Sequence, residues 1–420
     1  MPVVPFTPDS GVTSSAMIRT SKLAESVKPS ATLAAGAKAK QLKAAGVDVS
    51  DFSLGEPDFD TPTHIQAAAN EAMAKGHTHY TPAGGTAELK AAIAGWYGRV
   101  YGLEVKGENV IVSNGAKHSI HTALAAGVGP GDEVIIPTPY WVSYSDLVTM
   151  TGADAVLVNT TLESGFNLTP AQLKAAITPK TKLLMLNSPC NPTGTVYTKA
   201  ELEALADTFL ENCDGAIMSD EIYEQLVYGD AKATCVATLR PQLKDRTITI
   251  SGASKSYAMT GWRIGWAIAP AAFVKGMDTI QSQETSCPSS VSQYAMITAL
   301  NSPESPKCVA EMRTEFAARR ELTMKLLKAM PGVKAHEPDG AFYAFFDVSA
   351  YFGKTFAGKV VTNSNDFCTT LLEQAHVNLV TGAAFGAEGF VRMSFACSRE
   401  NIEKGLGKLA EWLKKGEPAV

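Results

Sequence analysis

Hydrophobic and polar positions follow two different periods from about residue 63 onward. Apolar residues recur at helical spacing over 65–75, 86–101 and 198–210, and short uninterrupted apolar runs lie between such segments. These runs are predicted strands, at 110–112, 134–136, 182–186, 216–218, 247–250 and 264–269. Short, wholly apolar strands separated by helices are typical of a mainly parallel sheet that helices cover on both faces.

The pattern changes after about residue 310. A long charged helix is predicted over 311–330, and strands over 342–348 and 391–395 alternate with further helices. This α+β pattern indicates a separate lobe. A predicted helix at 38–46 and a strand at 49–54 could join that lobe from the N-terminal side.

Composition excludes several classes of protein. With 420 residues, 45% hydrophobic and 19% charged, the chain can bury sizeable cores, and disorder or a coiled coil fits poorly. The formal net charge of −5 gives no general attraction to nucleic acid. No apolar run approaches the roughly 18 residues of a membrane helix, so we expect a soluble protein.

Seven cysteines form neither a C-x-x-C pair nor a Cys/His cluster, so we expect no metal site and a cytoplasmic location. Residues 1–27 lack the basic start and apolar core of a secretory signal. An organelle transit peptide and a flexible N-terminal extension both stay open for this segment.

Polar residues follow the predicted strands directly, where the strand ends of such a sheet meet at one edge. A helix opening at Gly115-Ala116 offers free backbone N–H groups to an anion. Lys255 follows a buried strand, where desolvation lowers an amine pKa. By itself Lys255 could be a solvated loop residue, but an acid, a phenol, an amide and an arginine accompany it. Together they favour pyridoxal phosphate (PLP), which reacts through a lysine Schiff base.

Five sequence blocks in a fixed order carry a family resemblance. They are Leu54–Phe59, Pro139–Tyr144, Asn191–Gly194, Gly252–Lys255 and Gly261–Gly265. From about residue 28 to the C-terminus the chain resembles class I/II PLP-dependent aminotransferases of fold type I, in the bacterial aspartate and aspartate/prephenate aminotransferase branch. The resemblance implies a large domain with a mainly parallel seven-stranded sheet between helices, plus a smaller α+β domain. We therefore expect a large PLP-binding domain at 61–309, and a discontinuous small domain at 28–60 and 310–420.

The resemblance also implies a role for each matching residue. Lys255 bonds the cofactor and then moves a proton, Asp220 keeps the ring nitrogen protonated, and Tyr223 hydrogen-bonds the ring 3-oxygen. Tyr80 reaches the phosphate from the partner subunit of a homodimer. The full set of expected cofactor-binding residues is Gly115, Ala116, Lys117, Trp141, Asn191, Asp220, Tyr223, Ser254, Lys255, Arg263 and Tyr80.

For the substrate, the resemblance implies that Arg392 pairs the α-carboxylate, with Gly55, Trp141 and Asn191 beside it. The acidic side chain of a substrate needs a second cation. In one branch of the family an arginine of the partner subunit supplies it, but the comparable stretch of this sequence, residues 281–292, contains no Lys or Arg. In the branch that this sequence resembles, the matching cations are Lys117 and Lys28. We therefore predict transfer of the amino group of aspartate to 2-oxoglutarate.

Simpler explanations stay open for single residues. Asp220 could be a strand-end acid, Trp141 core packing, Tyr80 a surface residue, Arg392 half of a salt bridge, and Gly55 a turn glycine. Prephenate or another amino acid could be the substrate. A PLP-dependent C–S lyase, an aminocyclopropane-carboxylate synthase and a non-catalytic regulator are further alternatives.

Overall fold

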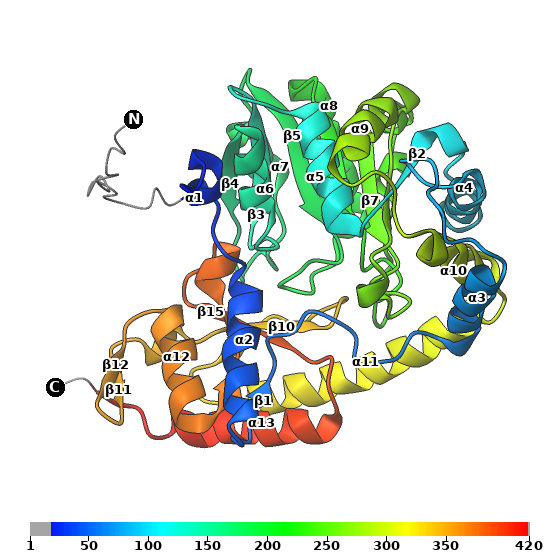
Figure 1. Cartoon of the computed structure of the whole chain (residues 1–420). Helices are drawn as coiled ribbons and strands as arrows, with labels where there is room; N and C mark the ends of the chain where they lie inside the picture. Colours follow the sequence, from blue (N-terminus) through cyan, green and yellow to red (C-terminus); the bar gives the residue numbers. More distant parts are fainter. Residues whose placement is uncertain (1–17, 419–420) are drawn as a thin grey trace, which may run out of the picture.

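The computed structural model describes residues 18–418, and its centre is the predicted seven-stranded sheet (Figure 1). Only β8 runs antiparallel, to both of its neighbours, and the remaining pairs are parallel. The strand order is β2 (Val110–Ser113), β8 (Gly265–Ile268), β7 (Thr247–Gly252), β6 (Ala216–Asp220), β5 (Thr181–Asn187), β3 (Glu133–Thr138) and β4 (Asp154–Asn159). The predicted mainly parallel α/β architecture is therefore confirmed.

Side chains alternate between two hydrophobic cores on opposite faces of this sheet. On β3, Val134 and Ile136 belong to the core that contains residues of α5 (Ala116–Gly127), α6 (Tyr144–Thr151) and α9 (Ala271–Glu284). Ile135, between them, belongs to the core under α7 (Pro170–Ala176) and α8 (Lys199–Asn212). Because both faces are buried, these strands have no polar face, which explains their uninterrupted apolar sequence.

Beyond β2, a third core is formed with α3 (Thr63–Ala74), α4 (Ala87–Tyr101) and α10 (Ser290–Asn301). Helix α4 begins where the Thr86 hydroxyl accepts a hydrogen bond from the Leu89 N–H, 3.2 Å away, and ends at Gly102 in the left-handed conformation. These end signals hold α4 close to its predicted bounds.

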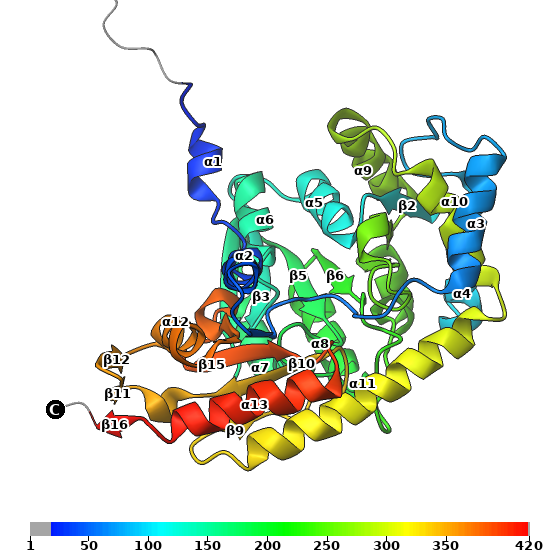
Figure 2. The same ribbon diagram turned by 60° about the horizontal axis from the view of Figure 1, so that its bottom comes forward.

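The C-terminal third packs around an antiparallel sheet in the order β14 (Val380–Thr381), β15 (Phe390–Ser394), β10 (Tyr343–Asp347) and β9 (Lys334–Ala335). Its other elements are α11 (Ser305–Lys328), α12 (Ser364–Ala375), α13 (Arg399–Leu413), β11 (Lys354–Phe356), β12 (Lys359–Val361), β13 (Val377–Asn378) and β16 (Glu417–Pro418). Figure 2 shows α11 and α13 running along the side of the molecule that carries this sheet.

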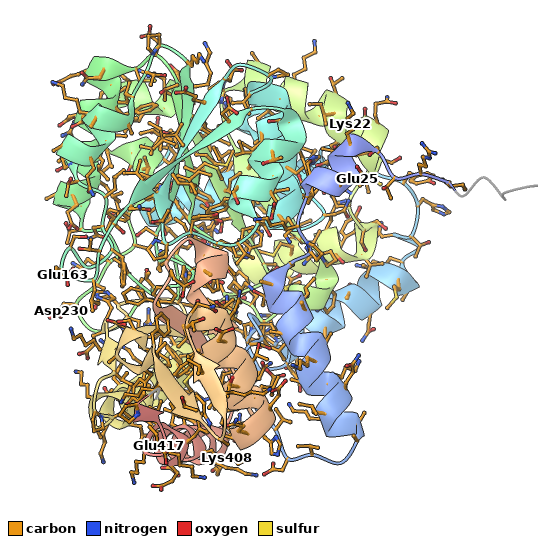
Figure 3. The ribbon with its side chains drawn as sticks, turned by 90° about the vertical axis from the view of Figure 1, so that its left-hand side faces the viewer. Lys22, Glu25, Glu163, Asp230, Lys408 and Glu417 are labelled. Carbon is orange, nitrogen blue, oxygen red and sulfur yellow. The ribbon has the colours of Figure 1, made fainter. Side chains whose placement is uncertain are left out.

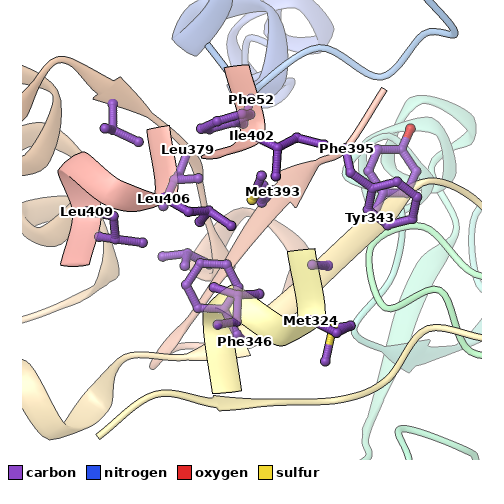
Figure 4. Close-up of a cluster of buried hydrophobic side chains, with 14 of the residues drawn as sticks. Phe52, Met324, Tyr343, Phe346, Leu379, Met393, Phe395, Ile402, Leu406 and Leu409 are labelled. Atoms are coloured by element: carbon purple, nitrogen blue, oxygen red, sulfur yellow. The ribbon is translucent and has the colours of Figure 1, made fainter. Parts of the chain in front are cut away.

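The N-terminal segment joins that C-terminal core. β1 (Ser50–Asp51) pairs in parallel with β13, and α2 (Ala31–Ala44) contacts β13 and β14. Phe52 belongs to one buried cluster with Ile402, Leu406 and Phe346 (Figure 4). This packing supports the discontinuous small domain, whose boundaries at 28–60 and 310–420 we keep as a proposal.

Several elements differ from the predicted pattern; the short strands β9, β11, β12, β13, β14 and β16 were not predicted, and α11 begins before the predicted helix at 311–330. β4 was missed, β1 is shorter than the predicted strand at 49–54, and α2 begins before the predicted helix at 38–46. The short helix α1 (Lys22–Ser26) buries no side chain, and Figure 3 shows Lys22 and Glu25 on it at the edge of the fold. A transit peptide within residues 1–17 would lie outside the described chain. Among residues 18–418, no helix has both the length and the apolar character needed to span a membrane.

Candidate functional site

A cavity of about 600 Å³ opens between the carboxyl ends of the parallel strands and the elements around β10, β15 and α2. This is the position that a mainly parallel sheet favours for a ligand. Most of the residues selected from the sequence line it, namely Gly55, Ala116, Lys117, Trp141, Asn191, Asp220, Tyr223, Ser254, Lys255, Arg263 and Arg392. The structure thus brings together side chains that are up to 337 positions apart, from Gly55 to Arg392 (392 − 55 = 337).

One end of the cavity is suited to an anion. The first turn of α5 leaves the N–H groups of Ala116 and Lys117 without partners inside the helix. The Arg263 guanidinium donates to the carbonyl oxygens of Thr260 at 2.8 Å and Asn114 at 3.3 Å, and neither oxygen neutralises its charge. The helix start and Arg263 therefore offer a binding site for a phosphate.

Gly115 is required at this end because of its size and its backbone conformation. Its φ is +87°, in the region that favours glycine. A Cβ on Gly115 would lie 2.3 Å from Nη2 of Arg263. Gly115 therefore supports the anion site by letting the guanidinium pass, although it is not among the residues lining the cavity. Ser254, largely buried at the end of β7, adds a hydroxyl to the lining.

Asp220 ends β6, and its buried carboxyl accepts two hydrogen bonds. Its Oδ2 accepts from the Tyr144 hydroxyl at 2.6 Å, and its Oδ1 accepts from the Ile222 N–H at 3.2 Å. Burial raises the pKa of Asp220 to about 6, although both hydrogen bonds and Lys255 act to lower it. A cationic group of a ligand beside Asp220 would stabilise the ionised carboxylate.

Lys255 lies just beyond β7 and reaches the opposite wall of the cavity. Its Nζ donates to the carbonyl oxygen of Gly55. Burial lowers the pKa of Lys255 to about 8, Glu56 opposes that change, and Arg392 and Arg263 add to it. At about pH 7 roughly a tenth of the amine is therefore neutral, far more than for an ordinary lysine, and the neutral form is the one that a nucleophile or a proton acceptor requires.

Arg392 is a buried guanidinium, 1% exposed, in the middle of β15. Its Nη1 donates to Asn191 Oδ1 at 2.9 Å and its Nη2 to the Ser53 carbonyl oxygen at 2.7 Å, while Nε has no partner. No carboxylate among residues 18–418 forms an ion pair with it, and burial lowers its pKa. Within the described chain Arg392 is therefore not half of a salt bridge. A buried cation without an acid favours an anionic ligand, and a guanidinium fits a carboxylate with two parallel hydrogen bonds.

Trp141 and Lys117 form another part of the wall. The Nζ of Lys117 lies 4.8 Å from the centre of the Trp141 ring. Burial and the nearby Arg263 lower the pKa of Lys117. Trp141 is half-buried and presents part of its surface to the cavity, so core packing does not account for it fully.

Besides Gly115, two selected residues lie outside the cavity. Tyr80 is 92% exposed, and Lys28 has only a long contact, 3.5 Å from its backbone N to Asp146 Oδ1. Lys40, which was not selected, does line the cavity. It shares one face of α2 with Leu33, Gly36 and Ala37, and that helical spacing could have identified it once the direction of the face was known.

Sequence reasoning also missed Tyr343, Glu56 and Tyr144. Tyr343 and Glu56 line the cavity, and Tyr144 holds the Asp220 carboxyl. Gly55 was selected as a neighbour of a carboxylate, but its described contact is the hydrogen bond from Lys255.

Comparisons with known proteins found similar sequences and a similar structure. The family model described as aminotransferase class I and II matches residues 47–409. The aspartate/prephenate aminotransferase of Cereibacter sphaeroides is 46% identical over 91% of this chain and 96% of its own length. The aspartate aminotransferase of Geobacillus stearothermophilus is 45% identical over 94% and 99% of the two chains. The crystal structure of the aspartate aminotransferase from Rhizobium meliloti superimposes with a TM-score of 0.92 at 42% identity, covering 95% of this chain and all of that one.

Proposed function

Because the chain belongs to the class I and II aminotransferases, we propose that it transfers the amino group of aspartate to 2-oxoglutarate with PLP as its cofactor. The aminotransferase class predicted from the sequence is confirmed. Aspartate as the substrate is supported by relatives at 42–46% identity that are named aspartate or aspartate/prephenate aminotransferases.

One observation carries this proposal. The buried Arg392, which has no acid partner in the described chain, lies in the same cavity as Lys255. Every amino acid substrate presents an α-carboxylate and an α-amino group. Arg392 can hold the carboxylate through its planar guanidinium, and Asn191 at 2.9 Å fixes the orientation of that group.

The residues around the cavity fit PLP group by group. The start of α5, Ser254 and Arg263 would hold the phosphate, and Asp220 would face the ring nitrogen. Trp141 would lie on the ring, and Tyr223 and Asn191 would hydrogen-bond its 3-oxygen. When bound, PLP supplies a carbonyl that bonds amines and a ring that accepts electrons from the substrate Cα.

The side chains of this protein do the remaining work. The neutral amine of Lys255, favoured by its pKa of about 8, can take a proton from the substrate Cα and return it elsewhere. The Asp220 carboxylate, held by Tyr144, stabilises a positive charge at the ring nitrogen. Arg392 and Asn191 orient the substrate so that its Cα–H bond faces Lys255.

The second carboxylate of aspartate needs a cation at the open side of the cavity. Lys117 and Lys40 both line that cavity, whereas Lys28 does not. We assign the distal carboxylate to Lys117 and Lys40, and Lys28 would contribute only after movement of the N-terminal segment. Prephenate, which also carries two carboxylates, stays a second candidate because of the name of the Cereibacter relative.

A homodimer in the cytoplasm completes the proposal. Tyr80 is 92% exposed in the single chain, so a phosphate contact from this residue would be made in a neighbouring subunit. An exposed aromatic side chain of this size is typical of an interface. Tyr80→Phe in a dimer should weaken cofactor retention, whereas the same variant should have no effect if the active unit is a monomer.

A panel of single-turnover reactions tests the function. The purified enzyme is mixed with one amino acid at a time, and the cofactor absorbance and the released oxo acid are recorded. With aspartate and with glutamate we expect the absorbance change of the cofactor to go to completion. The product should be a 2-oxo acid, released without ammonia. Conversion with alanine or aromatic amino acids but not with acidic ones would refute aspartate as the substrate. Pyruvate with ammonia would indicate a lyase.

A further inference from the structure

Tyr343 contacts both halves of the site from within the apolar strand β10. It is fully buried, it lines the cavity, and its hydroxyl lies 2.9 Å from the hydroxyl of Tyr223. Its ring centre lies 4.5 Å from the guanidinium carbon of Arg392. Tyr343 therefore touches one residue of the proposed cofactor contacts and one residue of the proposed carboxylate contacts.

Strand register explains how one side chain reaches both residues. β10 pairs antiparallel with β15, Tyr343 is opposite Ser394, and Phe345 is opposite Arg392. Tyr343 and Arg392 are thus diagonal neighbours on one face of this sheet, a distance that an aromatic ring and a long side chain can span. In Figure 4 the Tyr343 ring lies at one end of the buried cluster and its oxygen points away from the aliphatic side chains.

The position of the hydroxyl is fixed from another side as well. A Cβ on Gly55 would lie 2.9 Å from the Tyr343 oxygen, so the backbone passes directly against it. Gly55 in turn accepts the hydrogen bond from Lys255. The Tyr343 hydroxyl is therefore confined between Gly55 and Tyr223.

Counting protons determines the direction of the hydrogen bond between the two phenols. Each hydroxyl has one proton to donate. If Tyr223 donates its proton to the 3-oxygen of the cofactor, it has none left for Tyr343, so Tyr343 must donate to Tyr223. A phenol that accepts a hydrogen bond becomes a stronger donor itself, because hydrogen bonds in a chain polarise one another.

We propose that Tyr343 is a positioning residue with two separable actions, which rests on the proposed PLP-dependent function. Its hydroxyl donates to Tyr223 and strengthens the hydrogen bond from Tyr223 to the cofactor. Its ring packs against the Arg392 guanidinium and keeps this group oriented toward the substrate carboxylate.

The two actions are tested with Tyr343→Phe, which removes only the hydroxyl, and Tyr343→Leu, which also removes the ring. The control is Tyr351→Phe, since Tyr351 is a buried phenol of the same lobe that hydrogen-bonds the Pro331 carbonyl oxygen outside the cavity. The pH titration of cofactor absorbance in each holoenzyme reports the first action. The Kd of succinate, a dicarboxylate without an amino group, reports the second action by calorimetry.

For Tyr343→Phe we expect the spectroscopic pKa of the bound cofactor to rise by about half a unit, because a weaker donor at the 3-oxygen leaves more electron density on the cofactor. Its Kd for succinate should stay within about twofold of the wild-type value. For Tyr343→Leu the pKa should rise similarly and the Kd should increase about fivefold to tenfold. Tyr351→Phe should change neither quantity.

An unchanged or lowered spectroscopic pKa in Tyr343→Phe would overturn the first action, since a lowered value means that Tyr343 accepts the proton of Tyr223. An unchanged Kd in Tyr343→Leu would overturn the second. If the leucine variant does not fold, Tyr343→Met repeats the test with a flexible side chain that lacks a π face. Absence of cofactor absorbance or of succinate binding in the wild-type enzyme would instead refute the proposed function.

Discussion

Replacing Asp220 by asparagine removes the charge of this carboxyl but keeps its shape. The proposed site needs that charge beside the ring nitrogen, whereas in the protein without cofactor no cation of the described chain forms a hydrogen bond with this buried acid. The substitution should therefore stabilise the cofactor-free protein and inactivate the loaded enzyme. Opposite effects on stability and activity distinguish a functional acid from an ordinary strand-end acid.

The size of the stability effect follows from the pKa of the buried carboxyl. Burial raises the pKa of Asp220 from 3.8 to about 6, a difference of about 2.2. At about 1.36 kcal/mol per pKa unit, the ionised form costs the folded chain about 3 kcal/mol. That cost already includes the opposing effect of the Tyr144 hydrogen bond. Asparagine has only one acceptor oxygen for the two donors, the Tyr144 hydroxyl and the Ile222 N–H, so one hydrogen bond is weakened, at a cost of about 1–2 kcal/mol. A net gain of about 1–2 kcal/mol in unfolding free energy remains.

The pH dependence gives a sign that can be checked. Because the folded-state pKa of this carboxyl is raised, the folded chain holds the proton up to a higher pH than the unfolded chain does. The contribution of this group to wild-type stability therefore falls as pH rises from 3.8 to about 6. Above about pH 6 the full cost is present, and below about pH 4 both states are protonated. By linkage, the carboxylate cost at about pH 5 is roughly half of its value at about pH 8, so the advantage of the variant should shrink there.

The assay is urea unfolding of cofactor-free wild type and Asp220→Asn at about pH 5 and about pH 8, together with aspartate turnover of the loaded enzymes. Turnover should fall at least about a hundredfold. Glu221→Gln is a matched control, because Glu221 is a buried acid with a pKa raised by burial to about 7 and does not line the cavity. It should gain stability and retain turnover within a few-fold. If Asp220→Asn were no more stable at about pH 8, or kept its turnover, the assignment of Asp220 would be wrong.

Four further outcomes follow from the same site. Lys255→Ala should abolish turnover, and retained turnover would refute its role. Cofactor capture by wild type should quicken about tenfold between about pH 7 and pH 9 in stopped-flow mixing, because the neutral fraction of an amine with a pKa of about 8 rises from about 9% to about 91%. Arg392→Lys should raise KM for all amino acids about tenfold or more, since an ammonium cannot replace the guanidinium. Lys117→Met and Lys40→Met should each raise KM for aspartate more than for alanine, and Lys38→Met, whose lysine pairs with Glu373 at 3.7 Å, should not.

The central sheet was predictable because burial on both faces leaves an unmistakable apolar run in each strand. β4 was not, because it lies at the edge of the sheet and its residues Asp154 and Asn159 are exposed. A half-exposed strand with polar ends resembles a loop in sequence. The N-terminal helix α2 was shortened in the prediction because its alanine-rich first half shows little contrast between its faces.

The cofactor side of the site was predictable for a topological reason, because parallel strands deliver the residues that follow them to one edge. The substrate side depends on packing between distant segments. Lys40 was missed because only the orientation of α2 reveals which lysine faces the cavity. Tyr343 was missed because a tyrosine within the run Tyr343–Asp347 has the sequence of core packing, and its contacts with Tyr223 and Arg392 depend on tertiary structure.

The charges around the cavity connect these two sides. Among the residues of 18–418 that line the cavity, five are cations (Lys40, Lys117, Lys255, Arg263 and Arg392) and two are acids (Glu56 and Asp220), so the formal charge of the lining is 5 − 2 = +3 although the whole chain carries −5. A phosphate brings about −2, and zwitterionic aspartate brings about −1 more. In the proposed site Arg263 faces the phosphate and Arg392 faces the α-carboxylate, so a neutral amino acid leaves Lys40 and Lys117 without an anionic partner in a partly desolvated site. Local charge therefore favours an acidic substrate even though no arginine clamp is present at 281–292.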